Sequence, residues 1–264
     1  MPSYVVTGAS RGIGLEFVNH WQLSADDQNH VFAIVRNKTT ATHLTALARN
    51  NIVVLEADVT DAKALNLAAA EVSKITGGKL DYLINNAGGS SSLGITVTEL
   101  QVFPNPEAIE EDLLYNFKFN VVSVVHSINA FLPLLKSGTS KKVVSLSSGL
   151  GDLDLTLQAG STAQFSYSVA KAGLNMVVAK YAAELKSEGF VFLSLSPGVV
   201  NTSSTAKTIE EMKKLGGAIL KIAPDFKGPL QPEESVRMQL EVIHGWTVEH
   251  SGAFVSHLGN KQWV

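Results

Sequence analysis

The sequence has no cysteine, no excess of positive charge and no long apolar run, and each absence excludes a class of function. Without cysteine among its 264 residues, the chain can form no disulfide, thiolate metal site or cysteine nucleophile. Charged residues make up 17% of the chain and the formal net charge is −3, so no basic surface for nucleic acid is visible. No apolar run reaches the roughly 18 residues of a membrane span. We therefore expect neither nucleic acid nor a membrane as a partner.

Targeting and metal-binding signals are also missing from the pattern. Residues 1–7 run straight into a strand pattern, without the charged and apolar regions of a signal peptide. A cytoplasmic location is therefore the default expectation. The seven histidines show no spacing typical of metal ligands, so we expect no metal site.

What the sequence does contain is a regular succession of strand-like and helix-like segments. Hydrophobic residues make up 45% of the chain, which fits a large buried core. The strand-like runs are short and do not alternate with polar residues, as is typical of parallel strands buried on both faces. Repeated βα units predict an α/β fold with a doubly wound parallel sheet of about seven strands and helices on both faces. Strands are expected at 4–7, 30–35, 52–56, 80–84, 142–147, 191–196 and 253–257, and helices at 12–23, 62–75, 106–135 and 166–186.

One stretch departs from this rhythm. Residues 203–232 are polar at first and are then interrupted by glycine and proline. Because no linker divides the chain, we interpret residues 1–264 as a single domain into which 203–232 is inserted as a flap.

A glycine-rich turn follows the first expected strand and opens the first expected helix. Its sequence, Thr7–Gly14, has the spacing G-x3-G-x-G. Glycine lets the backbone turn tightly and approach a ligand, and the N-terminus of a helix attracts phosphate. The pattern predicts a dinucleotide phosphate site, with a glycine-rich turn that binds nothing as the alternative.

The end of the second expected strand indicates which dinucleotide is bound. An acidic residue there would select NAD, whereas an arginine suits the 2′-phosphate of NADP. The chain has Arg36 at this point and no acid, and Arg11 adds a cation from the glycine-rich turn. The two arginines favour NADP(H) over NAD(H), unless both are solvated surface cations.

Tyr167 and Lys171 are four residues apart on an expected helix, so they share one face. A neighbouring ammonium favours the phenolate form and is expected to lower the pKa of the tyrosine. Such a tyrosine can exchange a proton with a carbonyl or alcohol oxygen. A Tyr-x3-Lys pair also occurs by chance on many helices, so its weight depends on the surrounding motifs.

These motifs appear in the order found in the short-chain dehydrogenase/reductase family, and the chain resembles that family along nearly its whole length. Within it, the sequence is similar to the branch of C-factor-like proteins and fungal ketoreductases. The resemblance implies a single-domain Rossmann fold and a role for each matched residue. The motifs are Thr7–Gly14, Asn85-Asn86-Ala87-Gly88, Ser148, Tyr167-x3-Lys171 and Pro197-Gly198.

By this resemblance, Tyr167 is the proton donor and Ser148 binds the substrate oxygen, with Ser147 as its neighbour and rival. Lys171 holds the nicotinamide ribose and tunes Tyr167. Asn120 holds a water near the lysine, and Asn116 and Asn129 are less well placed alternatives. The residues expected to bind the cofactor are Gly8, Ser10, Arg11, Gly12, Ile13, Gly14, Arg36, Asn37, Asp58, Val59, Asn86, Ala87, Gly88, Tyr167, Lys171, Pro197, Gly198, Val200 and Thr202.

Residues 149–166 make the spacing between Ser148 and Tyr167 longer than is usual in the family. This insertion carries Asp152 and Asp154. If it lines the pocket, these acids favour a positively charged substrate; otherwise it is a surface loop with solvated acids. The pocket walls are expected at 89–93, 150–165 and 203–232.

The resemblance implies an NADPH-dependent oxidoreductase that reduces a ketone or aldehyde to an alcohol, reversibly. Two alternatives remain open: a protein that binds NADP(H) as a sensor or scaffold without turnover, and a non-redox isomerase or cyclase that uses the same pocket. The substrate is a small carbonyl compound in the first interpretation. The family also suggests a homodimer or homotetramer formed through the long helices.

Overall fold

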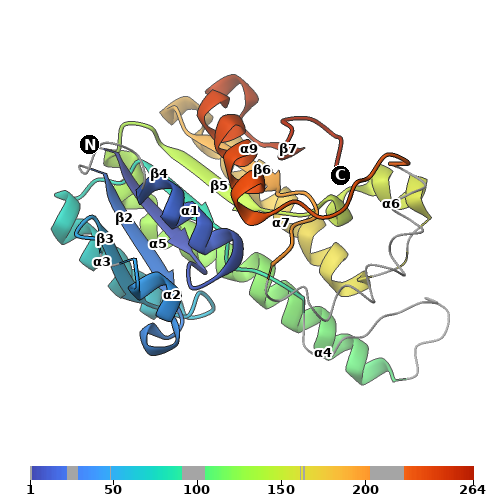
Figure 1. Ribbon diagram of the computed structural model, residues 1–264, viewed down its shortest axis with the longest axis horizontal. Coiled ribbons are helices and arrows are strands. Elements are labelled where there is room, and N and C mark those ends of the chain that lie inside the picture. The colour runs from blue at the N-terminus through green and yellow to red at the C-terminus, as the bar shows by residue number, and fades with distance from the viewer. Residues whose placement is uncertain are drawn as a thin grey trace.

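The computed structural model describes residues 2–22, 29–47, 49–90, 105–160, 162, 164–202 and 223–264. Its centre is one parallel sheet with the strand order β3-β2-β1-β4-β5-β6-β7, which confirms the expected doubly wound fold (Figure 1). The strands are β1 (Ser3–Thr7), β2 (His30–Val35), β3 (Ile52–Glu56), β4 (Tyr82–Asn85), β5 (Lys142–Leu146), β6 (Val191–Ser196) and β7 (Ala253–Ser256).

Helices connect the strands and cover both faces of the sheet. The α-helices of the described residues are α1 (Gly12–Gln22), α2 (Thr42–Thr45), α3 (Ala62–Thr76), α4 (Pro106–Phe117), α5 (Ser123–Ser137), α6 (Leu153–Ala159), α7 (Phe165–Leu185) and α9 (Pro232–Gly245). Shorter turns are η1 (Lys38–Thr40), η3 (Gly149–Gly151), η4 (Lys186–Glu188) and η5 (Val248–His250), and η2 (Lys118–Val122) is a π-helical segment between α4 and α5.

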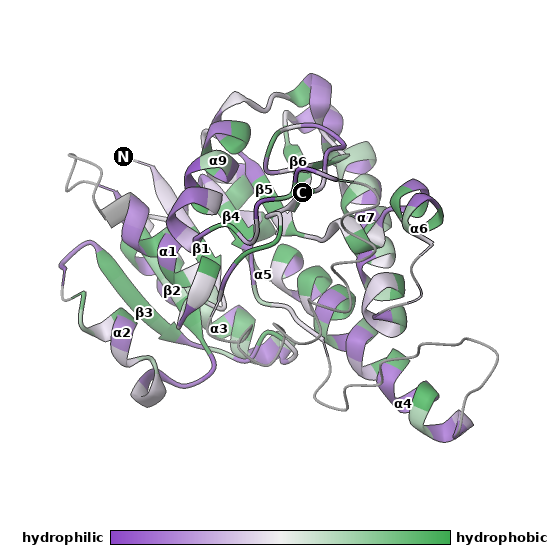
Figure 2. Ribbon diagram, turned by 45° about the vertical axis from the view of Figure 1, so that its right-hand side comes forward, coloured by the Kyte–Doolittle hydropathy of each residue, from purple (hydrophilic) through white to green (hydrophobic). Residues whose placement is uncertain are grey.

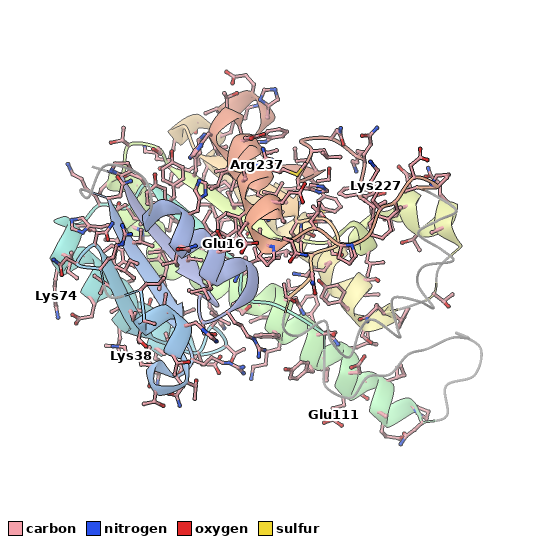
Figure 3. All side chains as sticks on the ribbon, in the orientation of Figure 1. Glu16, Lys38, Lys74, Glu111, Lys227 and Arg237 are labelled. Carbon is pink, nitrogen blue, oxygen red and sulfur yellow. The ribbon has the colours of Figure 1, made fainter. Side chains whose placement is uncertain are left out.

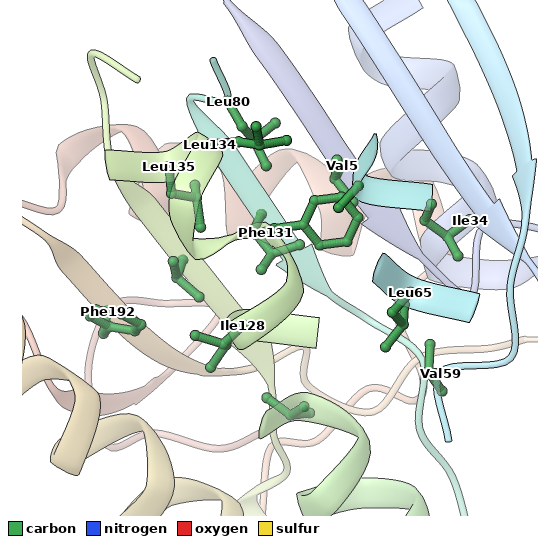
Figure 4. Close-up of a cluster of buried hydrophobic side chains, with 14 of the residues drawn as sticks. Val5, Ile34, Val59, Leu65, Leu80, Ile128, Phe131, Leu134, Leu135 and Phe192 are labelled. Carbon is green, nitrogen blue, oxygen red and sulfur yellow. The ribbon is translucent and has the colours of Figure 1, made fainter. Parts of the chain in front are cut away.

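The core has two apolar layers, one on each face of the sheet. The layer on the side of α3, α5 and α7 includes Phe131 of α5 and Phe192 of β6, both fully buried (Figure 4). The other layer includes Phe17 of α1 and Leu240 of α9. Successive side chains of a strand point to opposite faces, so each central strand supplies both layers. This is why the strands are almost continuously apolar in sequence (Figure 2).

Local capping explains where several helices begin and end. Asp61 accepts hydrogen bonds from the backbone of Lys63 and Ala64 at the start of α3, and Gly77, with φ 66°, ends that helix. Asn105 caps α4 in the same way. These are the residue types that satisfy free backbone groups at helix ends.

The expected single helix at 106–135 is interrupted. Figure 1 shows α4 projecting from the body of the molecule, whereas α5 lies against the sheet. The stretch Pro106–Ser137 is the one described helical region that is long and apolar enough to cross a membrane. Its α5 half buries Ile128, Phe131 and Leu135 in the core, which is the position of a core helix in this fold.

Charged side chains lie at the periphery of the described fold. Lys38, Lys74 and Glu111 are exposed on the turn after β2, on α3 and on α4 (Figure 3). The ion pair of Lys74 with Glu71 is formed between side chains more than half exposed, so it adds little to stability.

Candidate active site

The strand order reverses between β1 and β4. From β1 the chain adds β2 and β3 on one side of the sheet, and from β4 it adds β5, β6 and β7 on the other side, which leaves a crevice between β1 and β4. In open parallel sheets, ligands bind outside the carboxyl ends of the strands at such a point. All six loops that carry the expected site residues leave the sheet at this edge: after β1, β2, β3, β4, β5 and β6. The fold therefore brings the motifs together although they are far apart in sequence.

The glycine-rich turn has the backbone shape that a phosphate cradle needs. Gly8 and Gly12 have φ of 67° and 56°, which side chains rarely allow. A β-carbon on Gly14 would collide with the Asn86 side chain and the Gly8 carbonyl. The missing side chain of Gly14 therefore lets the turn pack against the loop after β4, and the turn leads into the N-terminus of α1, where free N–H groups suit a phosphate.

The loop after β4 braces this turn. Asn86 Nδ2 donates to the carbonyls of Thr7 and Gly8 at 2.9 and 3.1 Å. The Thr7 hydroxyl accepts from the backbone of Asn86 and Ala87 at 3.1 Å each. Asn86 therefore shapes the turn with its side chain.

The loop after β6 reaches the same turn. A β-carbon on Gly12 would lie 3.3 Å from Thr202 Cγ2, so the end of the Pro197–Thr202 loop touches the start of α1. Backbone hydrogen bonds join Leu230 to Val199 and Asn201, both at 2.8 Å. Residues 203–222 lie outside the described residues, and so does this part of the expected flap. The boundary at Pro232 is wrong, because Pro232 is the first residue of α9.

Charged groups gather at the ends of β2 and β3. Burial raises the pKa of Asp58, but hydrogen bonds from Thr60 and the charges of Arg36 and Lys118 outweigh it and lower the pKa overall. Arg36 is exposed beside this carboxylate. Asn37 caps η1 and accepts from the Thr39 backbone at 2.8 Å.

Sequence reasoning missed one acid at this edge. Glu56, the last residue of β3, accepts a hydrogen bond from the backbone of Lys38 at 2.9 Å. It thereby fixes the turn that follows β2. The register that pairs Val35 with Glu56 placed it there, and this register could not be read from the sequence.

Ser148 and Tyr167 come together next to the crevice. Ser148 follows β5 and caps η3, and its hydroxyl accepts from the backbone of Leu150 at 3.2 Å. The hydroxyls of Ser148 and Tyr167 are hydrogen-bonded to each other. Ser147 points elsewhere, since its buried hydroxyl donates to Asn175 Oδ1 at 2.7 Å.

Lys171 lies beneath Tyr167, and it is buried. Its Nζ donates to the Leu146 carbonyl at 2.7 Å and lies 5.5 Å from the centre of the Tyr167 ring. A β-carbon on Gly88 would lie 3.2 Å from this nitrogen and 3.0 Å from Asn120 Oδ1. A side chain at position 88 would press against both groups, so glycine lets the loop after β4 pack closely on the lysine and on Asn120.

The effect on the tyrosine is opposite to the expected one. Burial raises the pKa of Tyr167 to about 12, although the hydrogen bond with Ser148 acts in the other direction. Burial also lowers the pKa of Lys171 to about 7. In this buried setting the loss of water is the dominant effect on both groups. Sequence could not reveal this, because it shows the spacing of two groups but not their burial.

Asn120 occupies the π-helical segment η2 and bridges it to the loop after β4. Its Oδ1 accepts from Gly89 N at 3.0 Å, and its Nδ2 donates to Gly89 O at 2.8 Å and to Asn116 O at 3.0 Å. The rival asparagines are engaged differently. Asn116 donates to the Asp112 carbonyl, and exposed Asn129 accepts from the Tyr181 hydroxyl at 2.7 Å.

Asn175 is a further residue at this site that sequence reasoning missed. It follows Lys171 by four residues, just as Lys171 follows Tyr167, so the three share a face of α7. Asn175 accepts from Ser147 and lies 3.5 Å from the Gly151 carbonyl. The same helical spacing that indicated the Tyr–Lys pair would have found it.

The insertion after Ser148 forms η3 and α6 rather than a plain loop. Asp152 is 7% exposed; one of its oxygens caps α6 through Leu155 N at 2.9 Å and the other pairs with Lys261 Nζ at 2.7 Å. Its charge is thus neutralised within the protein, so it is not available to a cationic substrate. Asp154 is exposed. Of the expected pocket walls, residues 91–93, 161 and 163 lie outside the described residues.

The residues present fit a dinucleotide at this edge of the sheet. Three features follow one another along the carboxyl ends of β1 to β5. They are the glycine-rich turn at the N-terminus of α1, the cations beside Asp58, and Gly88, which packs on Lys171. In the part of the chain that the structure describes, no three histidine or acidic side chains gather as they would around a metal ion.

Comparison with known proteins gives the same picture. A family model described as short chain dehydrogenase matches residues 3–213. Over the full length of both proteins, the chain is 42% identical to the short chain dehydrogenase virK of Hypocrea virens. It is 44% identical, again over the full length of both, to the short-chain dehydrogenase/reductase AacuF of Aspergillus aculeatus.

Solved structures with this fold include carbonyl reductases. The NADPH-bound carbonyl reductase from chicken fatty liver superposes with a TM-score of 0.78 at 28% identity, covering 98% of each chain. The carbonyl reductase Sniffer of D. melanogaster gives a TM-score of 0.79 at 25% identity over the same share of each chain. From the match over most of its length and from its fungal relatives, the chain belongs to the short-chain dehydrogenase/reductase family of oxidoreductases.

Proposed function

We propose that the protein reduces a ketone or aldehyde to an alcohol with NADPH, with Tyr167 as the proton donor. The observation that carries the proposal is that the Ser148 hydroxyl lies close enough to the Tyr167 hydroxyl to lower its pKa through a hydrogen bond. Two hydroxyls that meet in this way can both bind one carbonyl oxygen. Groups aimed at an oxygen on which charge develops lower the barrier to its reduction.

The raised pKa of Tyr167 suits this role. At about 12, it keeps the hydroxyl protonated at neutral pH, as a proton donor requires. When bound, the reduced nicotinamide supplies the hydride to the carbonyl carbon. Tyr167 gives its proton to the carbonyl oxygen, Ser148 holds that oxygen, and Lys171 in its ammonium form stabilises the phenolate that remains. The reverse sequence oxidises the alcohol.

For the cofactor, we propose that Arg36 and Arg11 select NADPH over NADH. Both are exposed at the edge where the adenosine half would bind, and β2 ends without an acid. Glu56, the acid that ends β3, is hydrogen-bonded to the backbone of Lys38. The remaining cofactor contacts expected from the family, from Ser10 to Thr202, are part of the same proposal.

We also propose a homodimer or homotetramer that forms through α4 and α7. Leu114 and Met176 are 62% and 60% exposed on these helices, and Tyr115 and Phe117 add further apolar surface on α4. Light scattering at micromolar concentration tests this assembly. The cytoplasmic location and the single-domain organisation with a substrate-side flap also remain predictions.

The test of the reaction is the loss of NADPH absorbance with aromatic, aliphatic and polycyclic ketones and aldehydes. Tyr167→Phe, which removes only the hydroxyl, should lose most turnover and bind NADPH as well as the wild type. Turnover in Tyr167→Phe equal to the wild type would contradict the role of the tyrosine. NADPH binding without turnover of any carbonyl would favour the sensor or scaffold, and conversion of a substrate without a change in absorbance would favour an isomerase or cyclase.

A further inference from the structure

The serine turn, Ser148–Gly151, is packed from two opposite sides. On the inner side, a β-carbon on Gly151 would lie 2.8 Å from the Lys171 carbonyl carbon and 2.9 Å from Ala172 N. No side chain fits there, so the turn rests directly on the backbone of α7. The helix that carries Tyr167 and Lys171 therefore fixes one side of the turn that carries Ser148.

Trp263 packs on the outer side of the same turn. A β-carbon on Gly149 would lie 2.9 Å from Trp263 Cβ and 3.0 Å from Trp263 Cγ. Trp263 is 7% exposed, and its ring lies 4.4 Å from that of Phe254 on β7. The tryptophan thus connects the seventh strand to the residue next to Ser148.

An ion pair joins the same two parts of the chain. Lys261 Nζ lies 2.7 Å from Asp152 Oδ2, and 5.3 Å from the ring centres of both Phe254 and Trp263. Asp152 N in turn donates to the Gly149 carbonyl at 2.9 Å. A buried carboxylate is costly without a partner, so Lys261 stabilises the end of the serine turn. Figure 1 shows the chain end marked C between β7 and α6, where these contacts form.

The position of the Ser148 hydroxyl depends on this packing. Its Oγ accepts from Leu150 N, which lies within the turn itself. A change in the backbone between Gly149 and Gly151 would therefore move the hydroxyl relative to Tyr167. A displacement of about 1 Å in a catalytic group can reduce a rate by roughly 10²-fold.

We propose that Lys261 and Trp263 are positioning residues, which hold the serine turn so that the Ser148 hydroxyl meets that of Tyr167. This inference rests on the proposed function for its effect on turnover, but the packing can be tested without activity. It adds to the reaction two residues that lie more than a hundred positions after Ser148 and share no motif with it.

The first experiment compares Trp263→Ala with Trp246→Ala. Trp246 is the matched control, because it also stacks on a neighbour, His250, but lies beyond α9 and away from the serine turn. Trp263→Ala should lower kcat by about tenfold to a hundredfold with an unchanged Kd for NADPH, and Trp263→Phe should restore most of the rate. An equal loss of kcat and of thermal stability in both alanine variants would overturn the proposal.

A second readout reports the serine turn directly. Hydrogen exchange at the Leu150 amide, which donates to Ser148, should be faster in Trp263→Ala than in the wild type or in Trp246→Ala. Unchanged exchange would refute the positioning role even if the wild type reduced no carbonyl. An inactive wild type with faster exchange in the variant would instead support the packing and reject the proposed function.

The ion pair provides a test in which the lysine variant removes no buried side chain, because Lys261 is 63% exposed. Asp152→Asn keeps the oxygen that caps α6 and loses the charge, while Lys261→Met keeps the length of the side chain. If both act through one contact, each lowers kcat and the double variant is no worse than the worse single variant. Additive losses, or no loss in Lys261→Met, would contradict the proposal.

The pH dependence of alcohol oxidation separates positioning from general stability. Oxidation needs the phenolate, so its rate rises with pH as Tyr167 loses its proton. Because the Ser148 hydrogen bond lowers the pKa of Tyr167, a misplaced serine should shift this rise to higher pH in Trp263→Ala. The same profile in Trp263→Ala and the wild type would argue against a displaced hydroxyl.

Discussion

The turn after β1 and the turn after β5 both leave the carboxyl edge of the sheet, and both are rich in glycine. In the first, Gly8 and Gly12 have positive φ, so glycine is needed there for the shape of the backbone itself. In the second, Gly149 and Gly151 lie against Trp263 and α7, so the missing side chains make room for neighbouring parts of the protein. The comparison shows that glycine in one fold can serve either the shape of a backbone turn or the placement of a neighbouring hydroxyl.

The largest expected effect concerns the hydroxyl that the second turn carries. Ser148→Ala should lower kcat by about 10²–10³-fold, the usual result of removing a donor to a developing oxyanion. Ser147→Ala is its matched control, because the Ser147 hydroxyl donates to Asn175 and its loss should cost about 1 kcal/mol of stability instead. Steady-state kinetics and urea unfolding measure the two effects. Equal losses of kcat in the two variants would show that Ser148 has no role in turnover that Ser147 lacks.

The next effect tests whether the first turn depends on the absence of a side chain. Gly14→Ala places a methyl group against Asn86 and the Gly8 carbonyl, so it should disrupt the turn and weaken NADPH binding by tenfold or more, on the order of 1–3 kcal/mol for overpacking. Gly245→Ala is the control: a β-carbon there meets nothing within 4 Å, and alanine favours the helix. Calorimetry gives the Kd of both variants. A normal Kd for NADPH in Gly14→Ala would show that the first turn does not depend on the absence of this side chain.

A third prediction concerns the lysine beneath the second turn. Burial lowers the pKa of Lys171 to about 7, whereas it is near ~10.4 in an unfolded chain. Between these values the unfolded state binds more protons, so the free energy of unfolding should rise with pH, by at most about 1.4 kcal/mol per pH unit. Tyr167, whose pKa is raised, reduces stability only above roughly pH 10, the pKa of a free tyrosine.

Urea unfolding of the cofactor-free protein at pH 7.5, 8.5 and 9.5 measures this slope. The Lys171→Met variant cannot titrate at this position, so the difference between the wild type and the variant isolates the lysine. A constant difference across these three pH values would mean that Lys171 keeps an ordinary pKa.

The smallest effect is expected at the rim of the first turn. Arg36→Gln should reduce the preference for NADPH over NADH by about tenfold, since an exposed arginine contributes on the order of 1.4 kcal/mol or less to a charged contact. Arg237→Gln is the control, because Arg237 is exposed on α9 and paired with Glu241. The ratio of kcat/KM values for the two cofactors measures it. An unchanged ratio in Arg36→Gln would assign the selection to another residue.

The strands could be predicted closely because each is a short apolar run buried on both faces; the strands at 30–35, 52–56 and 191–196 have the predicted bounds. Helix α6 was missed because it is only seven residues long and exposes Leu153 and Leu157, so it has no amphipathic pattern. Helix α9 was missed for another reason. Its start was assigned to the flap, although Val236, Leu240 and Ile243 have helical spacing.

The candidate site also has parts that could be predicted from the sequence and parts that could not. Motifs that depend on local backbone shape, such as Thr7–Gly14, could be read directly from the residue types. The packing of Trp263 on Gly149 could not, because it joins positions 114 residues apart by shape alone. Nor could the direction of the pKa shift of Tyr167, which depends on how much water the fold removes from a hydroxyl.

The wide π-helical turn at Lys118–Val122 sets a constraint on chain length. It presents Asn120 to the loop after β4 while α5 keeps Phe131 in the core. A π turn holds about one residue more than an α turn, so deleting one of these five residues would close it into a regular α-helix and leave α4 and α5 in phase. The apolar face of α5 would stay on the core, but the wide turn that presents Asn120 would be lost, so a single-residue deletion here should remove the hydrogen bonds to Gly89 and leave the fold intact.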